Sequence, residues 1–392
     1  MTAGAARARI ESVDLLRGVI MILMALDHTR DYFGAPVNPT DVATTTVALF
    51  FTRWVTHFCA PVFFLLTGTG AFLALRRRSI PGLSRFLLTR GLWLIFLELF
   101  VVRCLGWQFN FDYHLTVLTV LWALGWAMIV LSALVWLPAS VVGIIGAAII
   151  VLHNLFDSVQ AASLGPFAPL WTALHAPGVL WTDGNHTLFA AYVLIPWVGV
   201  TAVGYSLGQV YRWEPERRRR LLGRMGVALI VAFIALRAAN IYGDPSNWAH
   251  QRSGIFTALS FINTTKYPPS LLYLLMTLGP ALLFLRAVDD RLPRVLRPAL
   301  VFGKVPMFYY VLHIVLIHLA AVAACLARYG SVHWMFESPS LDRYPITQPP
   351  GWPAPLPVVW LVWVSVVVLL YPVCRWFAGV KRRRTDWWLS YL

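Results

Sequence analysis

Long apolar stretches follow one another along almost the whole chain, and short polar connections separate them. Most stretches have about 20 residues or more, the length that an α-helix needs to cross a lipid bilayer. The apolar residues are continuous within each stretch, whereas the strands of a membrane barrel would alternate apolar and polar positions. The pattern therefore predicts an all-α, polytopic membrane protein with about ten transmembrane helices. We expect these helices near residues 13–34, 48–75, 86–107, 115–136, 139–156, 187–211, 221–242, 268–285, 299–327 and 357–379.

The composition excludes a water-soluble globular protein. Of the 392 residues, 59% are hydrophobic and 12% are charged, whereas soluble domains carry about 25% charged residues. Because the apolar stretches recur over the whole length, we expect a single transmembrane domain over residues 1–392.

The net charge of +15 raises the question of a nucleic-acid partner, which the positions of the basic residues argue against. With the N-terminus in the cytoplasm, 23 Lys and Arg residues fall in cytoplasmic connections, against four on the other side: Arg252, Lys266, Arg328 and Arg343. This asymmetry is typical of membrane topology. We therefore expect both termini in the cytoplasm, the inner (cytoplasmic) membrane as the location, and no nucleic-acid partner. A second role for these basic residues stays open, the binding of anionic lipid or of a phosphate ligand.

The first predicted helix carries the largest group of ionisable residues, which are costly inside a membrane and often mark a functional site. Arg17 and His28 are eleven residues apart, so they project from one helix face about 16 Å apart along its axis. Asp27 and Asp31 flank the histidine, and either could accept a hydrogen bond from its ring. A histidine held in this way could act as a general base. The alternative is that His28 pairs with neighbouring helices and holds the bundle together.

The next two predicted helices carry further charged pairs. Arg53 and His57 are four residues apart and share one helix face, at about the depth of the histidine on the first helix. Arg53 could pair with an aspartate of the first helix or bind an anionic group of a substrate. Glu98 and Arg103 are five residues apart, so we expect them to point in different directions and to pair with other helices.

Polar groups also occur on the ninth predicted helix and at the start of the first. Tyr309 and Tyr310 lie one turn before His313, and one of them could hydrogen-bond to it. Aromatic packing around a satisfied histidine is the alternative. Ser12 lies at the start of the first helix, where backbone N–H groups favour anions, and Lys304 belongs to the cytoplasmic basic residues.

The sequence favours neither a metal site nor disulfides. The four cysteines lie singly within apolar stretches, and no H-E-x-x-H spacing occurs. His313 and His318 are five residues apart and diverge on a helix, whereas His153 and Asp157 share a face at the outer end of the fifth helix. A metal could bind only through residues on separate helices, and we expect none.

Several stretches resemble the heparan-α-glucosaminide N-acetyltransferase catalytic-domain family, specifically its bacterial members. The resemblance extends over nearly the whole chain, and the spacing from Arg17 to His28 is also similar to that of the acyltransferase-three membrane family. The stretches that carry it are RIESVDLLRG and ALDHTRDYFG on the first helix, TRWVTHFCAPVFFLLTG at 52–68, RGLWLIFLELFVVR at 90–103, YPPSLLYLLMTLGPALL at 267–283, FGKVPMFYYVLHIVLIH at 302–318 and the tail RRRTDWWLSYL.

The resemblance implies an enzyme that moves an acetyl or short acyl group from cytoplasmic acetyl-CoA, or another acyl-CoA, to an extracytoplasmic acceptor. The acceptor would be an amine or hydroxyl of an amino sugar or other glycan. His28 would be a general base or an acyl carrier, with Asp27 or Asp31 orienting it and Arg53 stabilising the oxyanion. The residues assigned on this interpretation are His28, Asp27, Asp31, Arg53 and His57 for catalysis, Arg17, Ser12 and Lys304 for the acyl-CoA, and His313, Tyr310, Glu98 and Arg103 for the acceptor.

The chain differs from the lysosomal animal enzymes of this family at one position. Those enzymes have an asparagine where His28 falls, and their active histidine lies eleven residues later, where this chain has Pro39.

The sequence is also compatible with two other classes of function. A transporter or flippase of a glycan or amphiphile would line its pathway with the same charges, although the internal symmetry that such proteins often have is not visible. A noncatalytic membrane partner in envelope biogenesis is the third class. Membrane bundles of this size often dimerise, so a homodimer is compatible with each of them.

Overall fold

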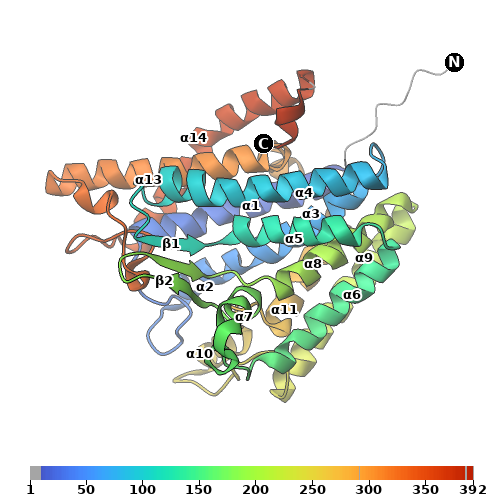
Figure 1. Cartoon of the computed structure of the whole chain (residues 1–392), viewed down its shortest axis with the longest axis horizontal. Helices are drawn as coiled ribbons and strands as arrows, with labels where there is room; N and C mark the ends of the chain where they lie inside the picture. Colours follow the sequence, from blue (N-terminus) through green and yellow to red (C-terminus); the bar gives the residue numbers. More distant parts are fainter. Residues whose placement is uncertain (1–9, 291, 385, 392) are drawn as a thin grey trace.

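The computed structural model describes residues 10–290, 292–384 and 386–391, and most of these residues are helical. Long helices lie beside one another, and a small sheet lies at one end of them (Figure 1). The α-helices are α1 Glu11–Phe33, α2 Val47–Trp54, α3 Cys59–Ala74, α4 Ile80–Phe96, α5 Val120–Leu134, α6 Ala139–Leu152, α7 Ala168–Leu174, α8 Ile195–Leu207, α9 Pro215–Ala239, α10 Gly254–Ile262, α11 Leu271–Val288, α12 Ala299–Lys304, α13 Pro306–Tyr329 and α14 Leu356–Arg383. The strands are β1 Leu115–Leu118, β2 Gly178–Thr182 and β3 Thr187–Ala190.

The helices have the character of a multi-pass membrane protein. Each of the ten predicted stretches overlaps a helix of the structure. Within the described residues, six helical stretches are long and apolar enough to cross a membrane: Val47–Ala74, Ala139–Phe156, Pro215–Ala239, Leu271–Val288, Pro306–Tyr329 and Leu356–Arg383.

Helix α1 lies in the centre of the molecule. It contacts α3, α11, α12, α13 and α14, which come from distant parts of the sequence (Figure 1). The many ionisable residues of α1 are therefore surrounded by protein, the arrangement expected for costly charges at membrane depth.

The prediction of an all-α chain is wrong in one region, where three short strands form a sheet in the order β1–β3–β2. Strands β1 and β3 pair in parallel with Leu115 opposite Thr187, and β2 runs antiparallel to β3. The predicted helical spans 115–136 and 187–211 thus begin as strands and become helical only at α5 and α8. An apolar stretch by itself does not distinguish a strand from a buried helix, and the Thr and Val of β1 favour the strand.

Several long helices are interrupted. Residues Leu97–Trp107 continue α4 as a π-helix, and a 3₁₀ turn at Val55–Phe58 joins α2 to α3. The predicted ninth helix breaks at Val305, which has φ −135° and ψ 51°, and α13 begins at Pro306. A proline disfavours the helical conformation of the residue before it and is well suited to the first position of a helix. These breaks matter for the site, because each adjoins one of the two cavities described below.

Glycines face each other where helices cross, which lets the backbones approach closely as in other membrane bundles. A Cβ atom added to Gly18 would lie 1.9 Å from the Ala299 carbonyl oxygen, and one added to Gly303 would lie 1.8 Å from the Asp14 carbonyl oxygen. The pairs are Gly18 with Gly303 (α1 and α12), Gly68 with Gly204 (α3 and α8), Gly91 with Gly125 (α4 and α5), Gly146 with Gly199 (α6 and α8) and Gly226 with Gly279 (α9 and α11). The first pair presses α12 against the part of α1 that carries Arg17.

Candidate active site

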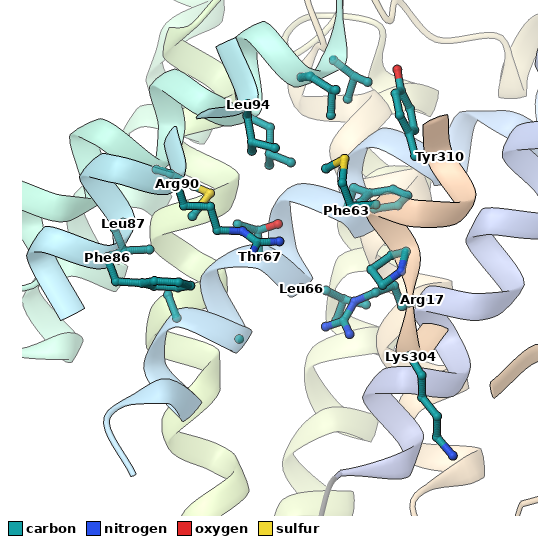
Figure 2. A pocket seen from close by; sticks show the side chains of 18 of the residues that line it. Arg17, Phe63, Leu66, Thr67, Phe86, Leu87, Arg90, Leu94, Lys304 and Tyr310 are labelled. Atoms are coloured by element: carbon teal, nitrogen blue, oxygen red, sulfur yellow. The ribbon is translucent and has the colours of Figure 1, made fainter. Parts of the chain in front are cut away.

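A cavity of about 270 Å³ lies among α1, α3, α4, α5 and the α12–α13 break. We call it the cationic cavity, because its charged lining residues are all basic: Arg17, Arg90, Lys304 and Lys381. Figure 2 shows Arg90 and Arg17 entering it from opposite sides, with Lys304 at one end and Tyr310 at the other. The rest of the lining is mainly apolar, including Phe63 and Leu66. Such a cavity combines anion-binding groups with a passage for an apolar or weakly polar chain.

The position of Arg17 depends on the close contact between α1 and α12. Its Nη1 atom donates to Asp14 Oδ1 at 3.0 Å and to the Gly303 carbonyl oxygen at 3.3 Å. Lys304 follows Gly303 directly, so the same contact brings Arg17 and Lys304 to one cavity. Arg17 and Lys304, each predicted from the sequence to bind the acyl-CoA, therefore line the same cavity.

A second cavity of about 430 Å³ is lined by α1, α2, α13, the sheet and several connecting loops. We call it the histidine cavity, after His28. Its charged lining residues are Asp27, Arg30, Asp31, Arg53 and Lys266, and its large aromatic ones are Trp107, Phe189, Tyr192, Tyr267, Tyr310 and Tyr344. Aromatic faces with charged groups between them are suited to a ligand that is both cyclic and polar, such as a sugar.

His28 is held by a second histidine. Its Nδ1 atom lies 2.8 Å from His313 Nε2, and His313 Nδ1 lies 3.0 Å from the Tyr309 carbonyl oxygen. A carbonyl can only accept, so His313 carries its proton on Nδ1 and its Nε2 accepts the proton of His28 Nδ1. The remaining nitrogen of His28, Nε2, then has a lone pair and no hydrogen-bond partner among the described residues. That lone pair is the group that a base or nucleophile requires.

The two aspartates do not orient His28, contrary to the expectation from their spacing. Asp27 forms ion pairs with Arg53 and, at 3.1 Å, with Arg30, and Asp31 also pairs with Arg30. The expected pairing of Arg53 with an aspartate is present. These ion pairs line the histidine cavity and neutralise one another in part, while the ring of His28 turns toward α13.

Tyr310 joins the two cavities. It lines both of them, as does Val120, and its ring centroid lies 6.3 Å from that of His28. The expected tyrosine hydroxyl bond to His313 is absent from the described contacts, because the carbonyl oxygen of Tyr309 takes that place and the Tyr309 ring stacks on His313. Tyr310 therefore lies where the two cavities meet, beside His28 and His313, without a hydroxyl bond to His313.

His57 and Ser12 lie apart from the two cavities. His57 is buried, its ring packs edge-on against Tyr273, and its Nδ1 atom has no hydrogen-bond partner among the described residues. The 3₁₀ turn that contains it rotates it away from the cavity that Arg53 lines. Ser12 is buried with its hydroxyl 3.5 Å from Asp289 Oδ1. Neither position supports direct contact with a ligand in these cavities.

Glu98 and Arg103 do not pair with other helices as expected, because their hydrogen-bond partners among the described residues lie in loops and in β1 next to the histidine cavity. Glu98 accepts hydrogen bonds from the backbone and hydroxyl of Thr119, a cavity-lining residue. Arg103 donates to Asn110, Asp112 and the Leu115 carbonyl, and so holds the loop before β1. Neither lines a cavity, so the predicted contact with an acceptor would be indirect.

Among the charged lining residues, the sequence reasoning did not assign Arg30, Arg90, Lys266 and Lys381 to the site. Lys266 is buried, and its ammonium group lies 5.1 Å from the ring centroid of Tyr267 and 5.8 Å from that of Tyr192. A signal was present in the sequence, because this arginine-rich chain has only the lysines Lys266, Lys304 and Lys381, and all of them line one of the two cavities.

The fold and the cavities together define a helical membrane protein with a cationic cavity and an aromatic cavity that meet at Tyr310, close to the contact between His28 and His313. Residues 9–243, more than half of the chain, match the model of the family described as "heparan-alpha-glucosaminide N-acetyltransferase, catalytic". The chain belongs to this family, as its sequence stretches indicated. A comparison with curated protein sequences finds no match. Lys266, Lys304 and Tyr310 lie beyond the matched range and line the cavities, and His313, also beyond it, contacts His28.

Proposed function

We propose that this protein is a membrane acetyltransferase that moves the acetyl group of acetyl-CoA, or another short acyl group, to an amine or hydroxyl of an amino sugar or other glycan. The observation that carries the proposal is the meeting of two chemically different cavities at Tyr310, beside the Nε2 lone pair of His28. Membership of an N-acetyltransferase family supports the same chemistry.

The cationic cavity would bind the acyl-CoA. Arg17, Arg90, Lys304 and Lys381 would contact its phosphates, since charge-assisted hydrogen bonds to phosphate are among the stronger polar interactions. The pantetheine arm would then follow the apolar lining toward Tyr310. The unbroken helix α1 spans eleven residues from Arg17 to His28, about 16 Å along its axis. The phosphates and the thioester could therefore occupy the two ends of one extended molecule.

His28 would act as the general base. Its Nε2 atom takes the proton of the acceptor amine or hydroxyl, whose nitrogen or oxygen then bonds to the thioester carbon. The C–S bond breaks, and the protonated His28 returns the proton to the CoA thiolate. In the two-step alternative, Nε2 attacks the thioester and carries the acyl group before the acceptor takes it. Tyr310 and Arg53 line the cavity where the oxyanion would form, and either could stabilise it.

The histidine cavity would bind the acceptor. Sugar rings can pack on its aromatic side chains, and an acceptor amine could bind the exposed part of Asp31. The proposal includes a single domain with ten spans and cytoplasmic termini, in which the cationic cavity opens toward the cytoplasm and the histidine cavity toward the opposite side. The basic connections support this orientation.

Acetyl-CoA turnover by the full chain in detergent tests the proposal. We expect the wild type to bind acetyl-CoA and to release free thiol, faster when glucosamine is added as acceptor. His28→Ala should keep binding and lose turnover, whereas Arg17→Ala should weaken binding. His250→Ala is the matched control, because His250 is exposed, contacts Trp248 and lines neither cavity. If the wild type neither binds nor cleaves a short acyl-CoA, the enzyme proposal fails, and flux of glycans across proteoliposomes becomes the relevant assay.

A further inference from the structure

A cluster of three metal-ligating side chains lies outside both cavities. His153 lies in the 3₁₀ turn after α6, Asp157 directly follows this turn, and His175 directly follows α7. One ligand atom from each residue can be chosen so that all three lie within 4.8 Å of one another. His153 and His175 are both almost completely buried, with 3% and 2% of their surface exposed.

The hydrogen bonding of the cluster is incomplete. Neither ring nitrogen of His153 has a hydrogen-bond partner of normal geometry among the described residues, although both are buried; the Pro269 backbone lies near the ring without completing such a bond. Asp157 Oδ1 is likewise buried without a hydrogen-bond partner, and it lies 3.7 Å from His175 Nε2. Buried polar atoms are nearly always satisfied, so a buried imidazole and a buried carboxylate oxygen that lack a normal hydrogen bond and lie near one another indicate a missing partner.

The other atoms of these residues are held as metal ligands usually are. Asp157 Oδ2 accepts from Asn154 Nδ2 at 2.8 Å, which fixes the carboxylate with Oδ1 toward the histidines. The His175 ring stacks on Trp171 at a centroid distance of 4.8 Å. Such outer contacts orient the ligands of metal sites. His175 Nε2 lies 2.9 Å from the His153 carbonyl oxygen, and this hydrogen bond would give way to a metal bond with the ring proton on Nδ1.

We propose that His153, Asp157 and His175 bind a divalent transition metal, with Zn²⁺ as the best match. Two imidazoles and one carboxylate are ligands that Zn²⁺ prefers, and water would complete its four-coordinate shell. Ligand atoms around tetrahedral Zn²⁺ lie about 3.3 Å apart. Side-chain movements of about an ångström would bring the ligand atoms of the three residues to this separation.

The metal has a structural role and takes no part in the transfer of the acyl group. It joins the end of α6 to the end of α7, two elements that are separated by the loop of residues 158–167. Pro177, two residues after His175, lines the histidine cavity, and β2 begins at the next residue. A metal at His175 therefore stabilises one wall of the cavity that would receive the acceptor.

Titration of the metal-free full chain in detergent with Co²⁺, followed by visible absorption, tests this inference. We expect one saturable equivalent per chain, displaced by Zn²⁺. Asp157→Asn and His153→Gln preserve side-chain size and should weaken binding about 10-fold or more. His186→Ala is the matched control, because His186 also lies beside an aspartate and another histidine, but on the surface. It should bind Co²⁺ as the wild type does.

Thermal unfolding supplies a readout that does not depend on enzyme activity. Zn²⁺ should raise the unfolding temperature of the wild type and of His186→Ala, since a ligand that binds only the folded state stabilises it. It should have no such effect on Asp157→Asn. The absence of saturable Co²⁺ binding in the wild type would overturn the inference, and so would wild-type affinity in Asp157→Asn. Neither result would bear on acetyl-CoA turnover, so this inference and the proposed function can fail separately.

Discussion

The Nδ1 atom of His28 lies 2.8 Å from the Nε2 atom of His313, and this contact determines which nitrogen of His28 is available for chemistry. The Tyr309 carbonyl oxygen fixes the proton of His313 on Nδ1, so His313 Nε2 accepts the proton of His28 Nδ1. The unprotonated nitrogen of His28 is then Nε2, which points away from His313. His313 thereby acts through His28 and is a positioning residue. Its role resembles that of the group that orients the base in other acyl-transfer sites.

Replacing His313 should therefore impair turnover without weakening acetyl-CoA binding. We expect His313→Ala to lower kcat about 100-fold, because His28 loses the acceptor that fixes its tautomer. His313→Gln can still accept from His28 Nδ1 through its amide oxygen and should recover part of the loss. Steady-state kinetics with acetyl-CoA and an amino-sugar acceptor give kcat and KM for both variants. An equal loss of kcat in His313→Ala and His313→Gln would indicate that His313 contributes to the packing of the bundle instead.

The sequence predicted the two ends of the site better than its centre. Arg17 and His28 could be placed on one face because α1 is unbroken between them, so local spacing determines their geometry. His313 is 285 residues away from His28, and only the packing of α1 against α13 brings the two together. The charges of Asp27 and Asp31 favoured them as partners, but the nearby Arg30 and Arg53 compete for both carboxylates.

The wall of the histidine cavity was missed for a different reason. Lys266 and Pro177 lie in connections between helices, where hydrophobic periodicity carries no information about position. Strands β1 and β3 were read as the first turns of helices, because their short apolar stretches continue directly into α5 and toward α8. Long-range packing of loops against the bundle decides both features, and neither leaves a periodic signal in the sequence.

The basic residues of the cationic cavity should determine the affinity for acetyl-CoA. We expect Lys304→Ala to raise KM for acetyl-CoA about 10-fold or more, since hydrogen bonds between charged groups contribute about 1.5–3 kcal/mol, and to leave kcat near the wild-type value. Arg220→Ala is the control, because Arg220 is exposed on α9 beside Glu216. Acetyl-dephospho-CoA lacks one phosphate of acetyl-CoA. If that phosphate contacts Lys304, the KM values of Lys304→Ala and the wild type should differ less with this donor than with acetyl-CoA. An unchanged KM in Lys304→Ala would place the phosphates elsewhere.

The contact between Gly18 and Gly303 should tolerate no side chain. An added methyl group on Gly303 would lie 1.8 Å from the Asp14 carbonyl oxygen, so α1 and α12 must separate. We expect Gly303→Ala to lower the free energy of unfolding by about 1–3 kcal/mol and to weaken acetyl-CoA binding, because Arg17 loses its contact with this segment. Gly254→Ala provides the comparison, since no atom lies within 4 Å of the position of its added methyl group. Thermal unfolding in detergent measures both variants, and equal stability would contradict the close contact.

The loop before β1 should lose stability in acid. Burial alone would raise the pKa of Asp112, but hydrogen bonds from Ser338, His114 and Arg103 outweigh it and hold the pKa below the usual range. A lowered pKa in the folded state contributes stability above the ordinary carboxyl pKa of about 3.9, and this contribution is lost as the pH falls through the lowered value. We expect Asp112→Asn to be less stable than the wild type at pH 6, with the difference shrinking below about pH 4. A difference that stays constant with pH would show that the charge of Asp112 contributes nothing.

The hydroxyl of Tyr310 should matter for the transfer step, because Tyr310 lines both cavities where they meet. If this hydroxyl donates to the oxyanion of the breaking thioester, Tyr310→Phe loses a donor that acts mainly in the transition state. We expect kcat to fall about 100-fold, within the range for a lost oxyanion donor, while KM for acetyl-CoA changes little.

Tyr309→Phe is the matched control for this prediction. Tyr309 is the adjacent residue, equally aromatic and buried, and its ring stacks on His313, yet it lines neither cavity. The backbone carbonyl that orients His313 is retained when its hydroxyl is removed. Near wild-type kcat in Tyr309→Phe with a large loss in Tyr310→Phe would assign the effect to the junction of the cavities. Equal losses in the two variants would attribute it to disturbed packing around His313, and no loss in Tyr310→Phe would leave Arg53 as the group that stabilises the oxyanion.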